Sequence, residues 1–412
     1  MQNDKAGVSA QDVADRAGVS RSAVSRAFTP GASVSAATRA RVMKAAQELG
    51  YHVNHLARGL VRNRSGIVCL IVSEIATPYR ATLVRWLTQF LQEAGKVAML
   101  INTDRSDNSV SAALLQAINF RADASIILSG MPDRTITRQC YQHGQRIILI
   151  NRDEALPGSL SINLDAQAAA ETAVMAFQRA GCRQLAFANS LAGTPSLIKR
   201  EAAFIAVAER AGLTVSVERF GTTSYESGQI LAHRLLTRHQ RPDAVFCVTD
   251  LMACGFMDEA RHRFQLRVPE DLCLIGYDNI AQAGWSSYNL TTFAQPVERF
   301  ARDAIAWLTQ TEQEESGFTP QSEQQHDTLL YQADVVWRGS RCAASCSSRG
   351  CHSCDTVTSG VANGNSNIAN AGLSLISGWC RHSVCGTSAS QSLCSVSATA
   401  VEKAGTTAAT WR

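Results

Sequence analysis

VSAQDVADRAGVSRSAVSR, residues 8–26, carries the pattern of two short helices joined by a tight turn. Ser9 can cap the first helix, because a serine oxygen accepts a hydrogen bond from the first turn of the backbone. Gly18 supplies the permissive backbone with which a chain leaves a helix, and Ser20 can cap a second helix directly after it. The apolar residues recur at helical spacing and are expected to face inward: Val13, Ala14, Ala17, Ala23, Val24 and Ala27. This stretch predicts a helix-turn-helix unit.

The outer face of the second helix is polar and carries Arg21, Ser22, Ser25 and Arg26. Arginine side chains reach guanine edges and phosphates, and short serine side chains let the backbone come close to a groove. We therefore expect this helix to read DNA. An amphipathic helix pair with two arginines is also compatible with a small structural bundle.

Two further features favour DNA binding. Val34-Ser35 opens a third helix that is expected to run to Leu49 and to end at Gly50. Residues 1–64 hold ten Lys and Arg against four Asp and Glu, a net charge of +6, whereas the whole chain carries +4. The remaining residues therefore sum to −2. Positive charge gathered in this way favours contact with phosphates.

The sequence resembles the lactose/galactose repressor (LacI/GalR) family of bacterial transcriptional regulators. The family pattern D-V-A-x-x-A-G-V-S-x-x-T-V-S-R matches residues 12–26, with Ala23 in place of the commoner Thr, and V-S-x-x-T-R-x-x-V matches residues 34–42. The match continues through residues 49–51, Asn54 and residues 57–60, although Val53 stands where the family usually has proline.

The resemblance implies roles for single residues. By it, Arg21, Ser22 and Arg26 correspond to base-reading positions, and Leu60 corresponds to the leucine that a hinge helix wedges into the minor groove at the operator centre. An ordinary buried leucine is the alternative for Leu60. The residues expected to position or contact DNA are Ser9, Ser20, Arg21, Ser22, Ser25, Arg26, Ser35, Asn54, Ala57 and Leu60.

Beyond residue 64 the composition changes. IVCLIV, residues 67–72, is a continuous apolar run typical of a strand buried on both faces, and a helical pattern follows over 78–94. Further strands are expected at 97–101, 125–128, 147–150, 185–188, 244–248 and 272–275, with helices between them such as 166–180 and 196–211. This alternation predicts parallel sheets. About 275 residues is too long for one core, so we expect two doubly wound lobes.

The predicted organisation follows from these patterns. An all-α headpiece occupies 1–53, a hinge helix or linker 54–64, an α/β effector-binding and dimerisation domain 65–340, and an atypical tail 341–412. The resemblance implies that the α/β domain is like a periplasmic sugar-binding protein. We expect one lobe over 65–160 with 292–325, and the other over 161–291 with 326–340, including a last strand near 329–337.

Charged residues follow three of the expected strands: Arg152, Asp250 and Asp278. Because ligands of such sheets bind beyond the carboxyl ends of the strands, these side chains are expected to line one cleft. Carboxylates and arginines make charge-assisted bonds to vicinal hydroxyls, which is the chemistry of sugar recognition. The resemblance adds Arg200 and also places Asp250 and Asp278 in a sugar pocket. Asp250 as a helix cap and Asp278 as a turn residue are the structural alternatives.

Tyr79 and Trp285 are candidates for an apolar platform under a sugar ring, although either residue can equally serve ordinary packing. A purine effector is the alternative to a sugar, and aromatic stacking residues in the pocket would favour it. No cofactor or metal is expected in this domain.

The leading hypothesis is a ligand-responsive repressor of a carbohydrate-use operon. One headpiece buries too little surface to select a site in a genome, so we expect a homodimer on a pseudo-palindromic operator. The segment 54–61 is too short to be stable as an isolated helix and is expected to fold when two copies meet on DNA. An effector that closes the lobes would then change operator affinity.

Two other classes of protein fit less well. Doubly wound sheets also host enzymes, but the sequence lacks a G-x-G-x-x-G after the first strand, a G-x-x-x-x-G-K-[ST] and a nucleophile elbow. An exported sugar-binding protein is opposed by the polar, basic amino-terminal unit. No run of eighteen apolar residues occurs, and six scattered cysteines fit free thiols, so a cytoplasmic, nucleoid-associated location is expected.

The segment 341–412 is rich in Ser, Gly, Ala and Thr and holds seven of the thirteen cysteines. Relatives in the resembled family typically end near the W-R-G-S stretch at 337–340. The tail shows no sustained period, so disorder or a shifted reading frame is the expectation. Cys351-His352-Ser353-Cys354 has metal-ligand spacing, but a second C-x-x-C is missing, and heptads for a tetramerising coiled coil are missing too.

Deleting residues 341–412 is expected to leave operator binding and dimer formation intact, because the expected contacts lie in the preceding segments. Light scattering after size exclusion and gel retardation measure the two properties. Loss of the soluble dimer would show instead that the tail is structural.

Overall fold

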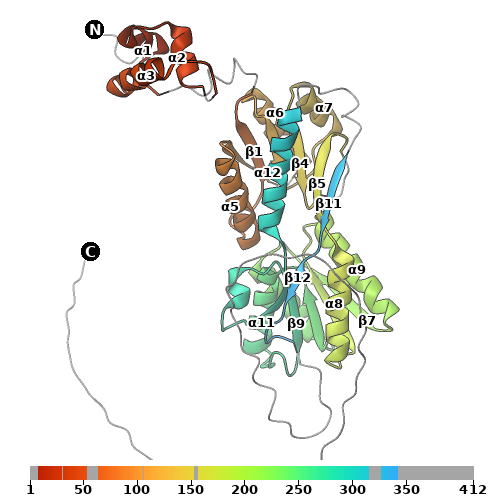
Figure 1. The fold of residues 1–412 in the computed structure, drawn as a ribbon. Coiled ribbons are helices and arrows are strands. Elements are labelled where there is room, and N and C mark those ends of the chain that lie inside the picture. The colour runs from red at the N-terminus through yellow and green to blue at the C-terminus, as the bar shows by residue number, and fades with distance from the viewer. Residues whose placement is uncertain are drawn as a thin grey trace, which may run out of the picture. The chain divides into compact units, whose positions relative to one another are not determined.

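The computed structural model describes residues 8–29, 31–52, 64–104, 106–152, 156–314 and 326–341. The proposed hinge contacts Asn54, Ala57 and Leu60 lie outside the described residues, as does the tail from residue 342 onward. Figure 1 shows the helical headpiece and the two α/β lobes.

The headpiece is three helices, each capped by a serine that the sequence predicted. They are α1 (Ala10–Ala17), α2 (Arg21–Ala27) and α3 (Ala36–Leu49). Ser9, Ser20 and Ser35 each accept a hydrogen bond from the backbone N–H three residues on, at 3.2 to 3.3 Å. Gly18 and Gly50 leave α1 and α3 in the left-handed region, as expected. The buried core is Val13, Ala14, Ala17, Val24, Ala27, Val42, Ala45 and Ala46.

The first lobe is built on a parallel sheet in the order β11-β5-β4-β3-β1-β2. Its strands are β1 (Ile67–Val72), β2 (Val97–Asn102), β3 (Ala124–Ile127), β4 (Arg146–Ile150), β5 (Ser159–Leu164) and β11 (Asp327–Tyr331). Its helices are α5 (Pro78–Glu93), α6 (Asp107–Asn119), α7 (Arg134–Gln142) and α12 (Val297–Glu314).

Helices cover both faces of this sheet because successive strand residues point in opposite directions. Val68, Leu70 and Val72 pack with α5 and α12, which lie side by side (Figure 1). Ile71 faces the other way and packs with residues of α6 and α7. The continuous apolar run at 67–72 is therefore explained by burial on both faces.

The second lobe repeats the plan with a sheet in the order β12-β10-β9-β8-β6-β7, parallel except for β12 against β10. Its strands are β6 (Gln184–Asn189), β7 (Thr214–Arg219), β8 (Ala244–Cys247), β9 (Cys273–Tyr277), β10 (Thr291–Ala294) and β12 (Asp334–Val336). Its helices are α8 (Ala166–Arg179), α9 (Pro195–Arg210), α10 (Tyr225–Leu236) and α11 (Asp250–His262), with the 3-10 turn η1 (Ala281–Gly284).

The lobe boundaries differ from the sequence-based expectation. β5 completes the first sheet and β10 lies in the second, so the chain crosses after Leu164 and after Ala294. The single strand expected near 329–337 is two strands, because the chain changes sheet between β11 and β12. Only two residues separate β11 from β12, so the sequence pattern reads as one strand.

α10 and α11 cross at unusually close range, which depends on two glycines. A Cβ on Gly255 would lie 1.9 Å from the carbonyl oxygen of Tyr225, and a Cβ on Gly228 would lie 2.1 Å from that of Met252. Both oxygens are backbone atoms within packed helices, so neither can give way cheaply.

Gly255→Ala is expected to lower the free energy of unfolding by about 1–3 kcal/mol, the usual cost of overpacking a core. Gly284→Ala is the matched control, because the nearest atom to its new Cβ is an arginine nitrogen at 3.7 Å. Urea denaturation followed by circular dichroism measures both. Equal midpoints for the two variants would contradict the tight crossing.

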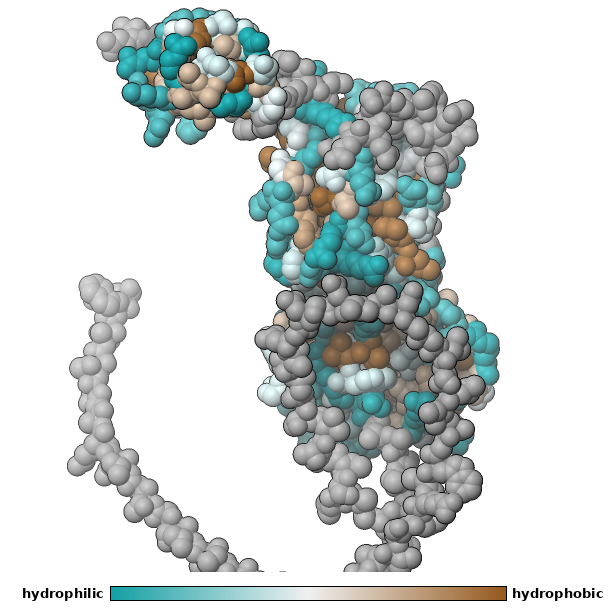
Figure 2. Space-filling model, viewed as in Figure 1, coloured by the Kyte–Doolittle hydropathy of each residue, from teal (hydrophilic) through white to brown (hydrophobic). Residues whose placement is uncertain are grey.

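No helix among the described residues is both long and apolar enough to span a bilayer. The six cysteines of the lobes are free, as predicted, and they are all buried. Hydrophobic residues show on the surface along the edge strand β11 (Figure 2), where Leu330 is 65% exposed.

Candidate functional site

The outer face of α2 has the polarity that the sequence predicted. Arg21, Ser22, Ser25 and Arg26 are exposed, whereas Val24 is buried against the other two helices. The Nε of Arg26 donates to the backbone oxygen of Ser22 at 3.4 Å, and the described residues offer no salt bridge to Arg21 or Arg26. Two cations on one exposed helix face are thus available to an anionic surface.

Arginines also fix this face to the rest of the headpiece. Arg16 of α1 forms a salt bridge of 2.9 Å with Glu48 of α3. Arg39 of α3 donates to the backbone oxygens of Ala27 at 2.5 Å and Ala32 at 3.3 Å, which ties the end of α2 to α3. The arginine-bearing face therefore sits on one rigid three-helix unit.

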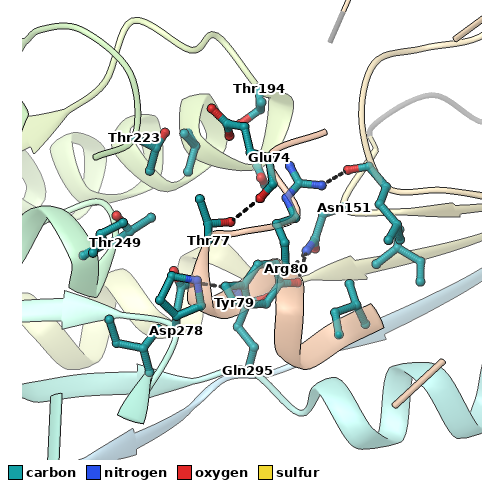
Figure 3. A pocket seen from close by; sticks show the side chains of 18 of the residues that line it. Glu74, Thr77, Tyr79, Arg80, Asn151, Thr194, Thr223, Thr249, Asp278 and Gln295 are labelled. Carbon is teal, nitrogen blue, oxygen red and sulfur yellow. Dashed lines mark hydrogen bonds between the residues drawn. The ribbon is translucent and has the colours of Figure 1, made fainter. Parts of the chain in front are cut away.

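A cavity of about 90 Å³, lined by both apolar and polar side chains, lies where the two lobes meet. That volume is several times the roughly 10–15 Å³ that one water molecule requires. Figure 3 shows Thr223 and Thr249 of the second lobe on the left of the cavity and Arg80 and Asn151 of the first lobe on the right. The polar residues that line it are Glu74, Thr77, Tyr79, Arg80, Asn151, Arg152, Thr194, Ser196, Arg200, Thr223, Thr249, Asp278 and Gln295.

Three arginines of the cavity, of which Arg152 and Arg200 are buried and Arg80 is half-buried, are held by backbone oxygens. Arg200, in the second turn of α9, is 4% exposed, donates to the oxygen of Val248 and lies 3.4 Å above the ring centre of Tyr277. Arg80 and Arg152 both donate to the oxygen of Leu128 at the end of β3. These contacts fix the guanidinium groups before any ligand arrives.

Asp278 follows β9 and brings a carboxyl group into the same cavity. Its φ of +115° is unusual for a residue other than glycine, and its N–H donates to the oxygen of Phe293 at 2.8 Å. The Nε2 of Gln295 donates to its Oδ1 at 2.6 Å. Burial raises the pKa of Asp278 to about 7, although the charge of Arg200 acts in the opposite direction.

Hydrogen bonds connect the two lobes across the cavity. The Nδ2 of Asn151 donates to the hydroxyl of Tyr79 at 2.8 Å and to the Oε1 of Gln295 at 3.5 Å, and Gln295 continues to Asp278. Two buried acceptors, Oδ1 of Asn151 and Oγ1 of Thr249, have no hydrogen-bond partner among the described residues. Buried polar atoms of this kind are suited to a polar ligand.

Comparison with known proteins agrees with both parts of this arrangement. The family described as "Bacterial regulatory proteins, lacI family" matches residues 5–54, and the "Periplasmic binding protein-like domain" matches residues 174–340. The HTH-type transcriptional repressor CytR of Escherichia coli K12 is 30% identical over 302 residues, which cover 72% of this chain and 88% of that protein. The chain belongs to the LacI family.

Solved structures of the LacI family show the same fold. The Lac repressor dimer bound to operator and the anti-inducer ONPF superposes with a TM-score of 0.72 at 24% identity, covering 82% of this chain and 99% of that one. The complex of the transcriptional regulator CelR with cellobiose gives a TM-score of 0.58 at 25% identity, covering 81% and 99%. The protein is thus a LacI-family DNA-binding transcriptional repressor and not an enzyme.

Four of the six effector residues expected in this LacI-family chain line the cavity: Tyr79, Arg152, Arg200 and Asp278. Asp250 does not line it. Its carboxylate is fully buried and accepts hydrogen bonds from Thr292 and from the backbone of Ile280. Trp285 is 55% exposed directly after η1 and also lies outside the cavity lining, which corrects the platform hypothesis for that residue.

Sequence reasoning missed Asn151, Thr249, Arg80 and Gln295 as cavity residues. Asn151 and Thr249 lie within two residues of strand ends, so the strand-end rule that selected Arg152 and Asp250 contained the signal. Gln295 follows β10, a strand of only four residues that the pattern did not reveal. Arg80 lies in the first turn of α5, beyond β1.

Proposed function

We propose that this repressor binds a pseudo-palindromic operator as a homodimer and that a sugar or sugar derivative in the cavity controls its operator affinity. The effector proposal is supported by the polar side chains that meet in one cavity. Both lobes contribute to this set, which consists of buried arginines, an acidic group, amides and hydroxyls. Such groups make the charge-assisted bonds that vicinal hydroxyls accept and donate. The bound cellobiose of the CelR relative supports the same class of ligand.

A purine is the weaker candidate for this cavity. Planar bases are usually held by aromatic stacking. Among the described residues that line the cavity, Tyr79 is the one aromatic residue. Its hydroxyl is already bonded to Asn151. Tyr277 lies against Arg200, whose guanidinium covers its ring. The polar groups therefore favour a polyhydroxylated ligand.

The dimer proposal is supported by the edge of the first sheet. β2 is an edge strand, and Val97 and Leu100 on it are 62% and 46% exposed. Exposed apolar residues on an unpaired strand edge are suited to pairing with another chain. A dimer places two α2 helices against two half-sites, which a pseudo-palindrome requires. Operator binding would locate the protein on the nucleoid in the cytoplasm.

Coupling between the cavity and the operator follows from the contacts that bridge the lobes. A ligand that bonds to Thr249 on one lobe and Asn151 on the other stabilises one relative arrangement of the lobes. The hinge segment 54–64 would carry this change to the headpieces, so that effector and operator affinities are linked reciprocally.

The effector proposal is tested by a thermal-shift screen of the full-length protein against sugars, sugar phosphates and purines, followed by operator retardation with each compound that binds. We expect a sugar-class compound to raise the melting temperature and to change operator affinity. If only purines bind, the sugar proposal is wrong and the effector is a purine.

Effector affinity is expected to depend on pH around neutrality. Above pH 7 the carboxyl group of Asp278 is ionised and accepts hydrogen bonds from ligand hydroxyls, whereas below pH 7 it takes up a proton, so affinity should fall as the pH falls from 8 to 6. Calorimetric titration across this range measures the slope. Asp278→Asn should flatten it, and a slope that persists in this variant would assign the dependence to another group.

A further inference from the structure

Asp250 is a buried carboxylate that does not reach the cavity and does not cap a helix. It is the first residue of α11, and the N-cap position belongs to Thr249. Its Oδ1 accepts the hydroxyl proton of Thr292 in β10 at 2.5 Å, and its Oδ2 accepts the N–H of Ile280 at 3.0 Å. One carboxylate thus joins three separate segments of the second lobe: α11, β10 and the turn after β9.

The turn that Asp250 holds is the one that carries Asp278. Asp278 and Asn279 have φ values of +115° and +52°, which residues with side chains seldom adopt without support. The N–H of Asn279 donates to the hydroxyl of Thr292 at 3.3 Å, and Arg338 donates to the side-chain oxygen of Asn279 at 2.7 Å. The turn is therefore held by Thr292 of β10 and by Arg338, which follows β12.

Strand β9 makes room for this carboxylate. A Cβ on Gly276 would lie 2.2 Å from Oδ1 of Asp250. The glycine therefore allows the carboxylate to pass beside the strand and to reach the turn that follows it.

β10, the second segment that Asp250 holds, leads to the other half of the site. Thr292 lies three residues before Gln295, whose amide donates to Asp278 and accepts from Asn151 of the first lobe. The position of Gln295 relative to Asp278 therefore depends on the register between β10 and the turn after β9. Asp250 bonds to both.

We propose that Asp250 is a positioning residue for effector recognition, which holds the turn at 278–280 and β10 so that Asp278 and Gln295 present a paired acid and amide to the cavity. This inference rests on the proposed small-molecule effector site. Asp250 itself touches no ligand in this arrangement. Its loss changes the affinity for the effector by releasing the groups that do.

The test compares Asp250→Asn with Asp258→Asn in the full-length protein. Asp258 is a matched control, because it lies on the same helix and accepts two hydrogen bonds, from Tyr225 at 2.6 Å and Tyr288 at 2.8 Å, but does not line the cavity. Hydrogen exchange of the peptide over 276–284 reports on the turn without ligand. Calorimetric titration with D-ribose and with cellobiose reports on recognition.

We expect Asp250→Asn to speed exchange in the 276–284 peptide at least tenfold and to weaken binding of the responding sugar at least tenfold, with operator retardation unchanged in the absence of sugar. Asp258→Asn should leave both the turn and the sugar affinity near those of the wild type. Thr292→Val should resemble Asp250→Asn, and Thr292→Ser, which keeps the hydroxyl, should restore both properties.

The inference would be overturned if Asp250→Asn and Thr292→Val kept the wild-type exchange rate of the 276–284 peptide and the wild-type sugar affinity. It would also be overturned if Asp258→Asn lost as much of both, because an equal loss would indicate general destabilisation. If the wild type binds neither sugar, that result counts against the proposed function for these two compounds. The exchange comparison still decides separately whether Asp250 holds the turn.

Discussion

Arg200→Ala is expected to weaken effector binding by about 2–5 kcal/mol, or roughly 30- to 5000-fold, the range for removing a buried charged group that is hydrogen-bonded to its partner. The size of the effect follows from burial. Arg200 is 4% exposed, is held over Tyr277 and faces the cavity beside Asp278, whose carboxyl group loses a neighbouring cation in the variant. Calorimetric titration of the effector found in the screen measures the loss.

Two controls separate recognition from folding in this experiment. Operator retardation without effector should remain at the wild-type level, since the headpiece does not include Arg200. Arg267→Ala removes an arginine that is paired with Asp271 on the surface, away from the cavity, and should leave effector affinity unchanged. Wild-type effector affinity in Arg200→Ala would remove this residue from the binding site.

Arg26→Ala is expected to weaken binding to the specific operator by about 1–3 kcal/mol, the usual effect of removing one base-reading arginine. Arg26 is exposed on the outer face of α2, and the alanine variant keeps the buried core of the headpiece, because Val24 and Ala27 supply the inward face. Fluorescence anisotropy at one fixed salt concentration measures the change on operator and on scrambled DNA. The loss of affinity should be larger on operator.

Arg210→Ala is the control for Arg26→Ala, because it removes one positive charge from an exposed position on α9, outside the headpiece. We expect it to change neither affinity. An equal loss for Arg26→Ala on operator and scrambled DNA would show that Arg26 contacts phosphates only, and an unchanged operator affinity would remove it from the interface.

The sequence predicted the headpiece well because local signals determine it. Each helix starts at a serine whose capping bond joins residues three apart, and α1 and α3 leave through glycines in the left-handed region. The buried and exposed faces of α2 follow from helical spacing alone. The strand-end rule likewise found Arg152 and Asp278, since parallel strands bring their carboxyl ends to one edge.

What the sequence did not reveal depends on contacts between distant segments. An acid after a strand can face the cavity, as Asp278 does, or turn inward, as Asp250 does, and the difference lies with Thr292, forty-two residues away. β10 and β12 are too short to show a strand pattern, so the crossings between the lobes and the role of Gln295 stayed hidden. Trp285 looked like a stacking platform by residue type, but its exposure depends on the η1 turn.

DNase footprinting of promoter DNA from the protein's own locus tests operator recognition by a symmetric pair of α2 helices. We expect protection of two half-sites related by a two-fold axis, with their centres about one helical turn apart or a multiple of it. Uniform, weak protection no different from that of random DNA, with and without the screened metabolites, would contradict this recognition.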